Sequence, residues 1–121
     1  MRVPPQIQCG HHSQALLRKW LADARLRGLQ NTYTGKRNRL RVTWHARLVV
    51  DILDGERAGQ TEYALAQDIS EACLGLRCRS PIPAWTTVRI RISENEPSVK
   101  ARVRHCTTTV GGYRIGLELV P

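Results

Sequence analysis

The chain has 121 residues, of which 41% are hydrophobic and 24% are charged. That apolar fraction is enough for one compact core and too high for a disordered chain. The formal net charge of +9 favours an anionic partner, although charge alone serves solubility equally well. No apolar run has the length that a signal peptide or a membrane-spanning helix needs, so we expect a cytoplasmic protein without membrane insertion and with reduced cysteines.

The N-terminal third of the chain predicts a leader followed by a helix. Residues 1–12 hold two prolines and a glycine without a hydrophobic period, which predicts a flexible leader. Ser13 is suited to cap an amphipathic helix that ends near Gly28. Its apolar stripe consists of Leu17, Trp20, Leu21 and Ala24. The stripe must be buried against the following domain or against a second copy of the chain, which would form a homo-oligomer.

The remainder of the chain alternates apolar and polar residues with the period of β-strands. Alternating segments cover residues 42–52, 61–66, 88–92, 99–104 and 113–119. Turn signals stand between them at Asp54-Gly55, Asn95-Glu96-Pro97 and Gly111-Gly112. Short strands with one apolar face and tight turns favour a closed antiparallel sheet, because closure removes exposed edges. We therefore predict a mainly all-β fold, a six-stranded antiparallel β-barrel with an N-terminal amphipathic α-helix.

Two polar segments flank the first strands of this predicted barrel. Residues 36–41 carry four basic side chains in six positions and predict a linker. Residues 68–76 begin with Asp68 and Ser70. Taken alone, a basic run is commonly a solvated segment, and an Asp-x-Ser sequence commonly bonds its own turn. Their order around the strands is the more specific signal.

In this order the two segments resemble the PilZ family, the bacterial receptor module for cyclic di-GMP. The family has an RxxxR element before its first strand, matched here by Arg37 and Arg41, and a [DN]xSxxG element after its second, matched by Asp68 and Ser70. The closing strand 112–119 is also similar, so the resemblance covers roughly residues 35–120. It implies a leader and helix in residues 1–34 and a PilZ-like barrel domain in residues 35–121.

The second element departs from the family pattern at its last position. Cys73 stands where the family has glycine, and Gly75 comes two residues later. Glycine at a ligand-facing turn permits positive φ, so a side chain there can cost on the order of 1 to 2 kcal/mol. The resemblance therefore leaves two interpretations. One is a cyclic di-GMP receptor, and the other is a degenerate PilZ-like module that works through protein contacts without the nucleotide.

The residue types suit a cyclic dinucleotide. Arginine donates in a bidentate manner to phosphate or to the edge of guanine, and it can stack on the base. An acid such as Asp68 can accept from the guanine N1 and N2 donors, and Ser70 can add a hydrogen bond. The resemblance implies a ligand site of Arg37, Arg41, Asp68 and Ser70, with Cys73 also facing the ligand. Ligand would then draw the linker onto the barrel and reorient the helix relative to the barrel. A downstream protein partner is also expected.

Other functions find less support in the sequence. Cys9, His11 and His12 could bind a metal, but no second group of metal ligands elsewhere in the sequence accompanies them. We therefore expect no metal and no cofactor besides the nucleotide ligand. No cysteine or serine is marked as a nucleophile beside an oriented histidine, so we expect no enzyme. Nucleic-acid binding would need exposed aromatic side chains, yet the chain has no Phe, and Trp44 and Tyr113 fall on apolar faces.

Overall fold

The structure is a computed structural model that describes residues 5–26, 31–32, 41–93 and 97–120, with side chains from Ser13 onward except in 31–32. One helix, α1 (Pro5–Leu26), precedes all the strands. The strands are β1 (Asn31–Thr32), β2 (Arg41–Thr43), β3 (Arg47–Ile52), β4 (Thr61–Ile69), β5 (Cys73–Cys78), β6 (Thr87–Arg91), β7 (Val99–Thr109) and β8 (Gly112–Leu119).

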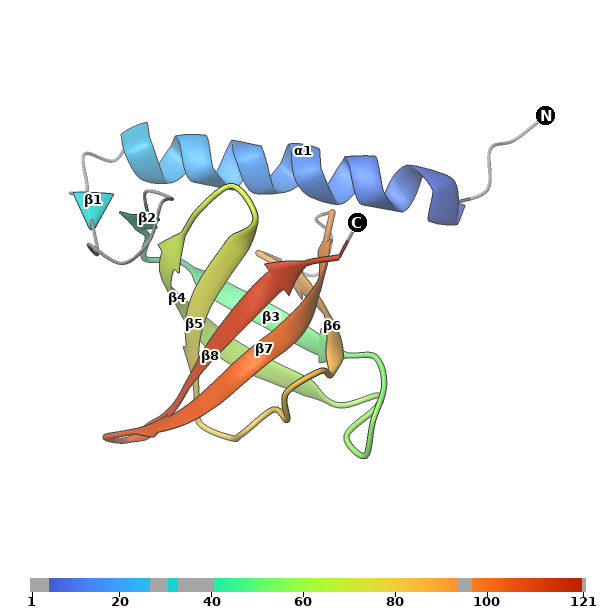
Figure 1. Cartoon of the computed structure of the whole chain (residues 1–121), viewed down its shortest axis with the longest axis vertical. Helices are drawn as coiled ribbons and strands as arrows, with labels where there is room; N and C mark the ends of the chain where they lie inside the picture. The colour runs from blue at the N-terminus through green and yellow to red at the C-terminus, as the bar shows by residue number, and fades with distance from the viewer. Residues whose placement is uncertain (1–4, 27–30, 33–40, 94–96, 121) are drawn as a thin grey trace.

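Strands β3 to β8 close into a six-stranded antiparallel barrel, as predicted (Figure 1). The pairing runs β4-β3-β6-β7-β8-β5 and returns to β4 through the β4–β5 pair. The short strands β1 and β2 extend the sheet beyond β4. The barrel strands bury mainly alternate residues, with register shifts between Ala66 and Asp68 in β4 and between Val103 and His105 in β7, and the largest fully buried side chain is Trp44. The predicted burial of Trp44 is confirmed, whereas Tyr113 is only partly buried.

The predicted strand over residues 42–52 is divided in two. Strand β2 pairs Thr43 with Asp68, whereas β3 pairs Arg47 with Leu65. Three residues, 44–46, therefore lie between these pairs on one segment, and only two, 66–67, lie between them on β4. The connection stays bonded to β4, since the Trp44 amide donates to the carbonyl of Gln67 at 3.0 Å. The extra residue acts like a β-bulge, which bends the chain without leaving the sheet.

Helix α1 begins at Pro5, eight residues before the predicted start, so the prediction of an irregular leader over residues 5–12 is wrong. Proline suits the first turn of a helix because its missing amide would have no partner there. Ser13 therefore lies inside the helix and does not cap it. Its buried hydroxyl accepts a hydrogen bond from the Lys100 amide at 3.1 Å, which ties α1 to β7. The predicted helix end near Gly28 lies outside the described residues.

Helix α1 lies across one end of the barrel and contacts β2, β4 and β7 (Figure 1). Its predicted apolar stripe is buried there, and Trp20 stacks on Trp44 with ring centroids 5.5 Å apart. The Trp44 indole N–H donates to Asp23 at 3.3 Å. The stripe is thus buried against the barrel of its own chain, and a homo-oligomer formed through this helix stays a prediction. No helix in the described ranges is long and apolar enough to cross a membrane.

Candidate functional site

Of the predicted ligand-binding residues, the structure brings Arg41 and Asp68 together. Arg41 is the first residue of β2, and Asp68 is the next-to-last residue of β4, so antiparallel pairing of these strands makes them neighbours. The Arg41 Nη1 donates to Asp68 Oδ1 at 2.9 Å. Arg37 lies outside the described residues, and its role stays a prediction.

A second arginine, which the sequence did not indicate, completes this cluster. Arg114 of β8 donates from Nη2 to Asp68 Oδ2 at 3.0 Å. Each carboxylate oxygen of Asp68 therefore has its own guanidinium partner, and such charge-assisted hydrogen bonds are roughly twice as strong as neutral ones. The Asp68 side chain is only 14% exposed, whereas that of Arg114 is 48% exposed. The cluster of Arg41, Asp68 and Arg114 carries a net charge of about +1 on the outer face of the barrel.

Two glycines explain how Arg114 reaches Asp68 across the intervening strand β5. Gly75 of β5 pairs with Asp68 on one side and with Gly116 of β8 on the other. A Cβ atom at Gly75 would lie 2.6 Å from Asp68 Oδ1, so the carboxylate occupies the space that a side chain would take. The ring of His105 lies over Gly116 in the same way. These residues form one row across four strands.

In the row of Asp68, Gly75, Gly116 and His105, the space beside the two glycines is taken by the Asp68 carboxylate and the His105 ring. A glycine inside a strand commonly marks such a close approach of another group. Here the two glycines stand beside a carboxylate and the two guanidinium groups that bind it. The arrangement can bind a group that offers both acceptors for arginine and donors for Asp68.

Ser70 and Cys73 form the turn between β4 and β5. The Ser70 amide donates to the Cys73 carbonyl at 2.9 Å, and the Cys73 amide donates to the Ser70 hydroxyl at 3.2 Å. Ser70 is only 3% exposed. The Ser70 side chain therefore bonds its own turn, which is the common alternative to ligand binding for an Asp-x-Ser segment. The ligand roles of Ser70 and Cys73 stay predictions.

Cys73 carries no backbone strain. Trp85, at φ 73°, is the single described non-glycine residue with a positive φ, so Cys73 has an ordinary backbone conformation. The backbone-strain part of the cost expected at this position is therefore absent, whereas the cost of a Cβ atom to the close approach of a ligand stays a prediction. The glycine that the local geometry requires is Gly75, because Asp68 occupies the space beside it.

Two further cysteines, Cys78 and Cys106, lie on barrel strands. Cys78 is buried on β5, and burial raises its pKa to about 12. Cys106 is half-buried on β7. Within the described ranges, no three His, Cys, Asp or Glu side chains gather as metal ligands would. The side chains of Cys9, His11 and His12 lie outside those ranges.

No family model matches the sequence, and no curated protein matches it either.

Proposed function

We propose that the chain is a cyclic di-GMP receptor or adaptor of bacterial second-messenger signalling, which binds the dinucleotide at the Arg41–Asp68–Arg114 cluster. The observation that carries the proposal is this cluster itself, in which Arg41 and Asp68 come from the two segments that resemble the PilZ elements. It stands on the outside of a six-stranded antiparallel barrel.

The chemistry of the cluster supports an anionic guanine ligand. A guanidinium has five N–H donors, and Arg41 and Arg114 each use one in the described bonds to Asp68. Their other donors can bind phosphate oxygens or the O6 and N7 acceptors of guanine. Asp68 already holds both groups in place, which lowers the entropy that a ligand must remove. Arg37 would join from the preceding segment, so that ligand bridges this segment to the barrel.

A second candidate is a degenerate PilZ-like module that contacts proteins and binds no nucleotide. The observation in its favour is that Asp68 and Ser70 already have partners in their own chain. A ligand would have to displace or rearrange the two ion pairs of Asp68. That exchange is favourable only if the ligand offers the arginines better acceptors.

Isothermal titration of the purified protein with cyclic di-GMP distinguishes the two candidates. The receptor should bind, and Arg37→Ala, Arg41→Ala and Asp68→Ala should each weaken binding by about tenfold or more, which corresponds to the loss of one charge-assisted hydrogen bond. Arg89→Ala is the matched control, since Arg89 is an exposed arginine on β6, away from the cluster. No heat at high ligand concentration would leave the degenerate module, and binding that none of the three variants weakens would refute the cluster as the binding site.

A further inference from the structure

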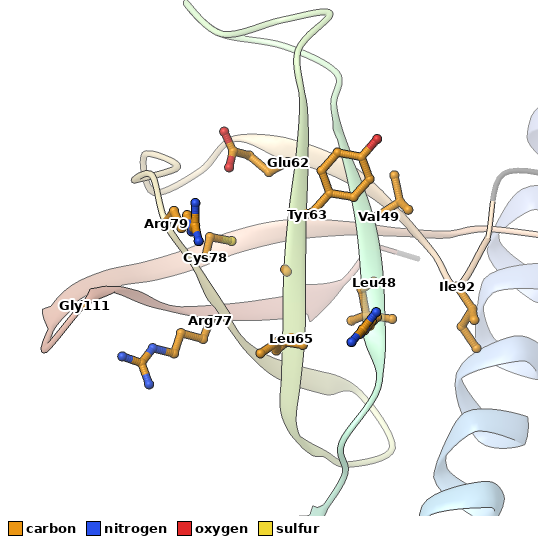
Figure 2. A pocket seen from close by; sticks show the side chains of 12 residues that line it. Leu48, Val49, Glu62, Tyr63, Leu65, Arg77, Cys78, Arg79, Ile92 and Gly111 are labelled. Atoms are coloured by element: carbon orange, nitrogen blue, oxygen red, sulfur yellow. The ribbon is translucent and has the colours of Figure 1, made fainter.

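The outer face of strands β3, β4 and β5 holds exposed apolar side chains between arginines (Figure 2). Tyr63 is 73% exposed and Leu65 is 54% exposed, and both stand on β4, which pairs with β3 on one side and β5 on the other. They line a surface hollow of about 680 Å³. We call this surface the arginine-flanked patch, which consists of Arg47, Val49, Tyr63, Leu65, Arg77 and Arg79.

Strand register places the charges of the patch beside its apolar residues. Leu65 pairs with Arg47 on β3 and with Arg77 on β5, so it stands between two arginines. Tyr63 pairs with Val49 on β3, and Figure 2 shows these two side chains next to each other. The apolar side chains therefore stand beside arginines, whose long side chains can carry their guanidinium groups to an anionic surface that the apolar side chains contact.

The positive charge of the patch is not neutralised within the described chain. Glu62 is the one acid among the residues that line the hollow, and it is already ion-paired with Arg57. Arg77 donates to a neutral acceptor, the carbonyl of Val110. The guanidinium groups of Arg47 and Arg79 have no hydrogen-bond or ion-pair partner among the residues that the structure describes. A partner of opposite charge is therefore the complementary one.

We propose that the arginine-flanked patch binds an anionic phospholipid surface. Highly exposed apolar side chains stand on two neighbouring parts of this face: Tyr63 and Leu65 on β4, and Val110, at 91% exposure, in the β7–β8 turn, which Arg77 joins to the patch. A fluid lipid surface accommodates exposed apolar side chains without matching their shape, whereas a protein partner must match it. Tyrosine suits the boundary between headgroups and acyl chains, and arginine binds lipid phosphate in a bidentate manner.

The proposal is independent of cyclic di-GMP binding, because it uses none of the residues of the Asp68 cluster. The patch nevertheless lies next to that cluster, since Arg77 pairs with Arg114 across β5 and β8. A protein adsorbed through the patch would hold the cluster close to the lipid surface.

Co-sedimentation of the full chain with vesicles tests the proposal. Vesicles of phosphatidylcholine with a third of phosphatidylglycerol should bind the protein, and vesicles of pure phosphatidylcholine should bind it much less. Two arginines near an anionic surface contribute about fivefold each, so Arg47→Ala/Arg79→Ala should weaken binding by roughly 25-fold. Tyr63→Ser/Leu65→Ser should weaken it by about tenfold or more, through loss of apolar contact. All four side chains are exposed, so these variants should fold, which circular dichroism checks.

The matched control removes the same charge elsewhere. Arg18→Ala/Lys19→Ala changes two exposed cations of α1 and should weaken binding by less than threefold, in keeping with a long-range effect of net charge. The proposal is overturned if anionic vesicles do not bind the protein. An acidic protein would then be the complementary partner of the patch. It is equally overturned if the control loses as much affinity as Arg47→Ala/Arg79→Ala, or if Tyr63→Ser/Leu65→Ser binds like the unmodified chain.

Discussion

Replacing Gly75 by alanine would place a methyl group 2.6 Å from Asp68 Oδ1, closer than real Cβ atoms approach an oxygen. The carboxylate must then turn away from Arg41 and Arg114. Each hydrogen bond to a charged group is worth about 1.5 to 3 kcal/mol, and the partial exposure of this cluster reduces that value. We therefore expect Gly75→Ala to lower the free energy of unfolding by about 2 kcal/mol. In a domain of this size the melting temperature should fall by roughly 5 to 10 °C.

The sign of the expected change in the free energy of unfolding makes this substitution informative. Inside a strand, Gly→Ala normally stabilises by about 0.5 to 1 kcal/mol, because alanine loses less backbone entropy on folding. In the Asp68→Ala background the methyl group meets no carboxylate, so Gly75→Ala should there be neutral or stabilising. Thermal and urea unfolding followed by circular dichroism measure both backgrounds. A Gly75→Ala protein as stable as the unmodified chain, or an equal loss in both backgrounds, would refute the role given to Gly75.

Three further predictions concern other parts of the structure. With a pKa of about 12 and a buried sulfur, Cys78 should resist iodoacetamide at pH 8 in the folded protein and react only after unfolding, as peptide mass spectrometry can show; rapid native alkylation would contradict its burial. The hydrogen bond from Arg91 lowers the pKa of Asp51, so this carboxylate stabilises the fold above its ordinary pKa and loses that effect as pH falls through the lowered value. Asp51→Asn should therefore cost most stability near neutral pH and progressively less in acid, by urea unfolding across pH; a pH-independent cost would contradict this. Cyclic di-GMP should slow amide exchange in residues 30–42, and unchanged exchange would remove the proposed bridging of that segment to the barrel.

Strand alternation was the most reliable guide to the fold, because burying one face of a sheet leaves a period of two in the sequence. Five of the six barrel strands were recognised in this way. Strand β5 was not, since its outward positions include Gly75 and its residues do not alternate between apolar and charged. The start of α1 was also missed, because the prolines and the glycine near the N-terminus indicated an irregular leader, yet the helix begins at Pro5.

The candidate site was predicted only in part, for a reason that concerns sequence distance. Arg41 and Asp68 were found because both belong to recognisable elements, and antiparallel pairing then makes them neighbours. Arg114 lies 46 residues from Asp68 and looks like any outward arginine of the last strand. Its role depends on Gly75, which removes a side chain between the two. Such a contact exists only in the closed barrel, so no local pattern can indicate it.

Nuclear magnetic resonance of isotope-labelled protein, titrated with cyclic di-GMP, reports binding and its location together. If the dinucleotide binds at the Arg41–Asp68–Arg114 cluster, the Asp68, Gly75 and Gly116 amides and the Arg41 and Arg114 side-chain signals should shift, with no shift of comparable size at Arg89 and none on addition of GMP at equal concentration. A spectrum that cyclic di-GMP leaves unchanged, or shifts confined to another face of the barrel, would contradict binding at this cluster.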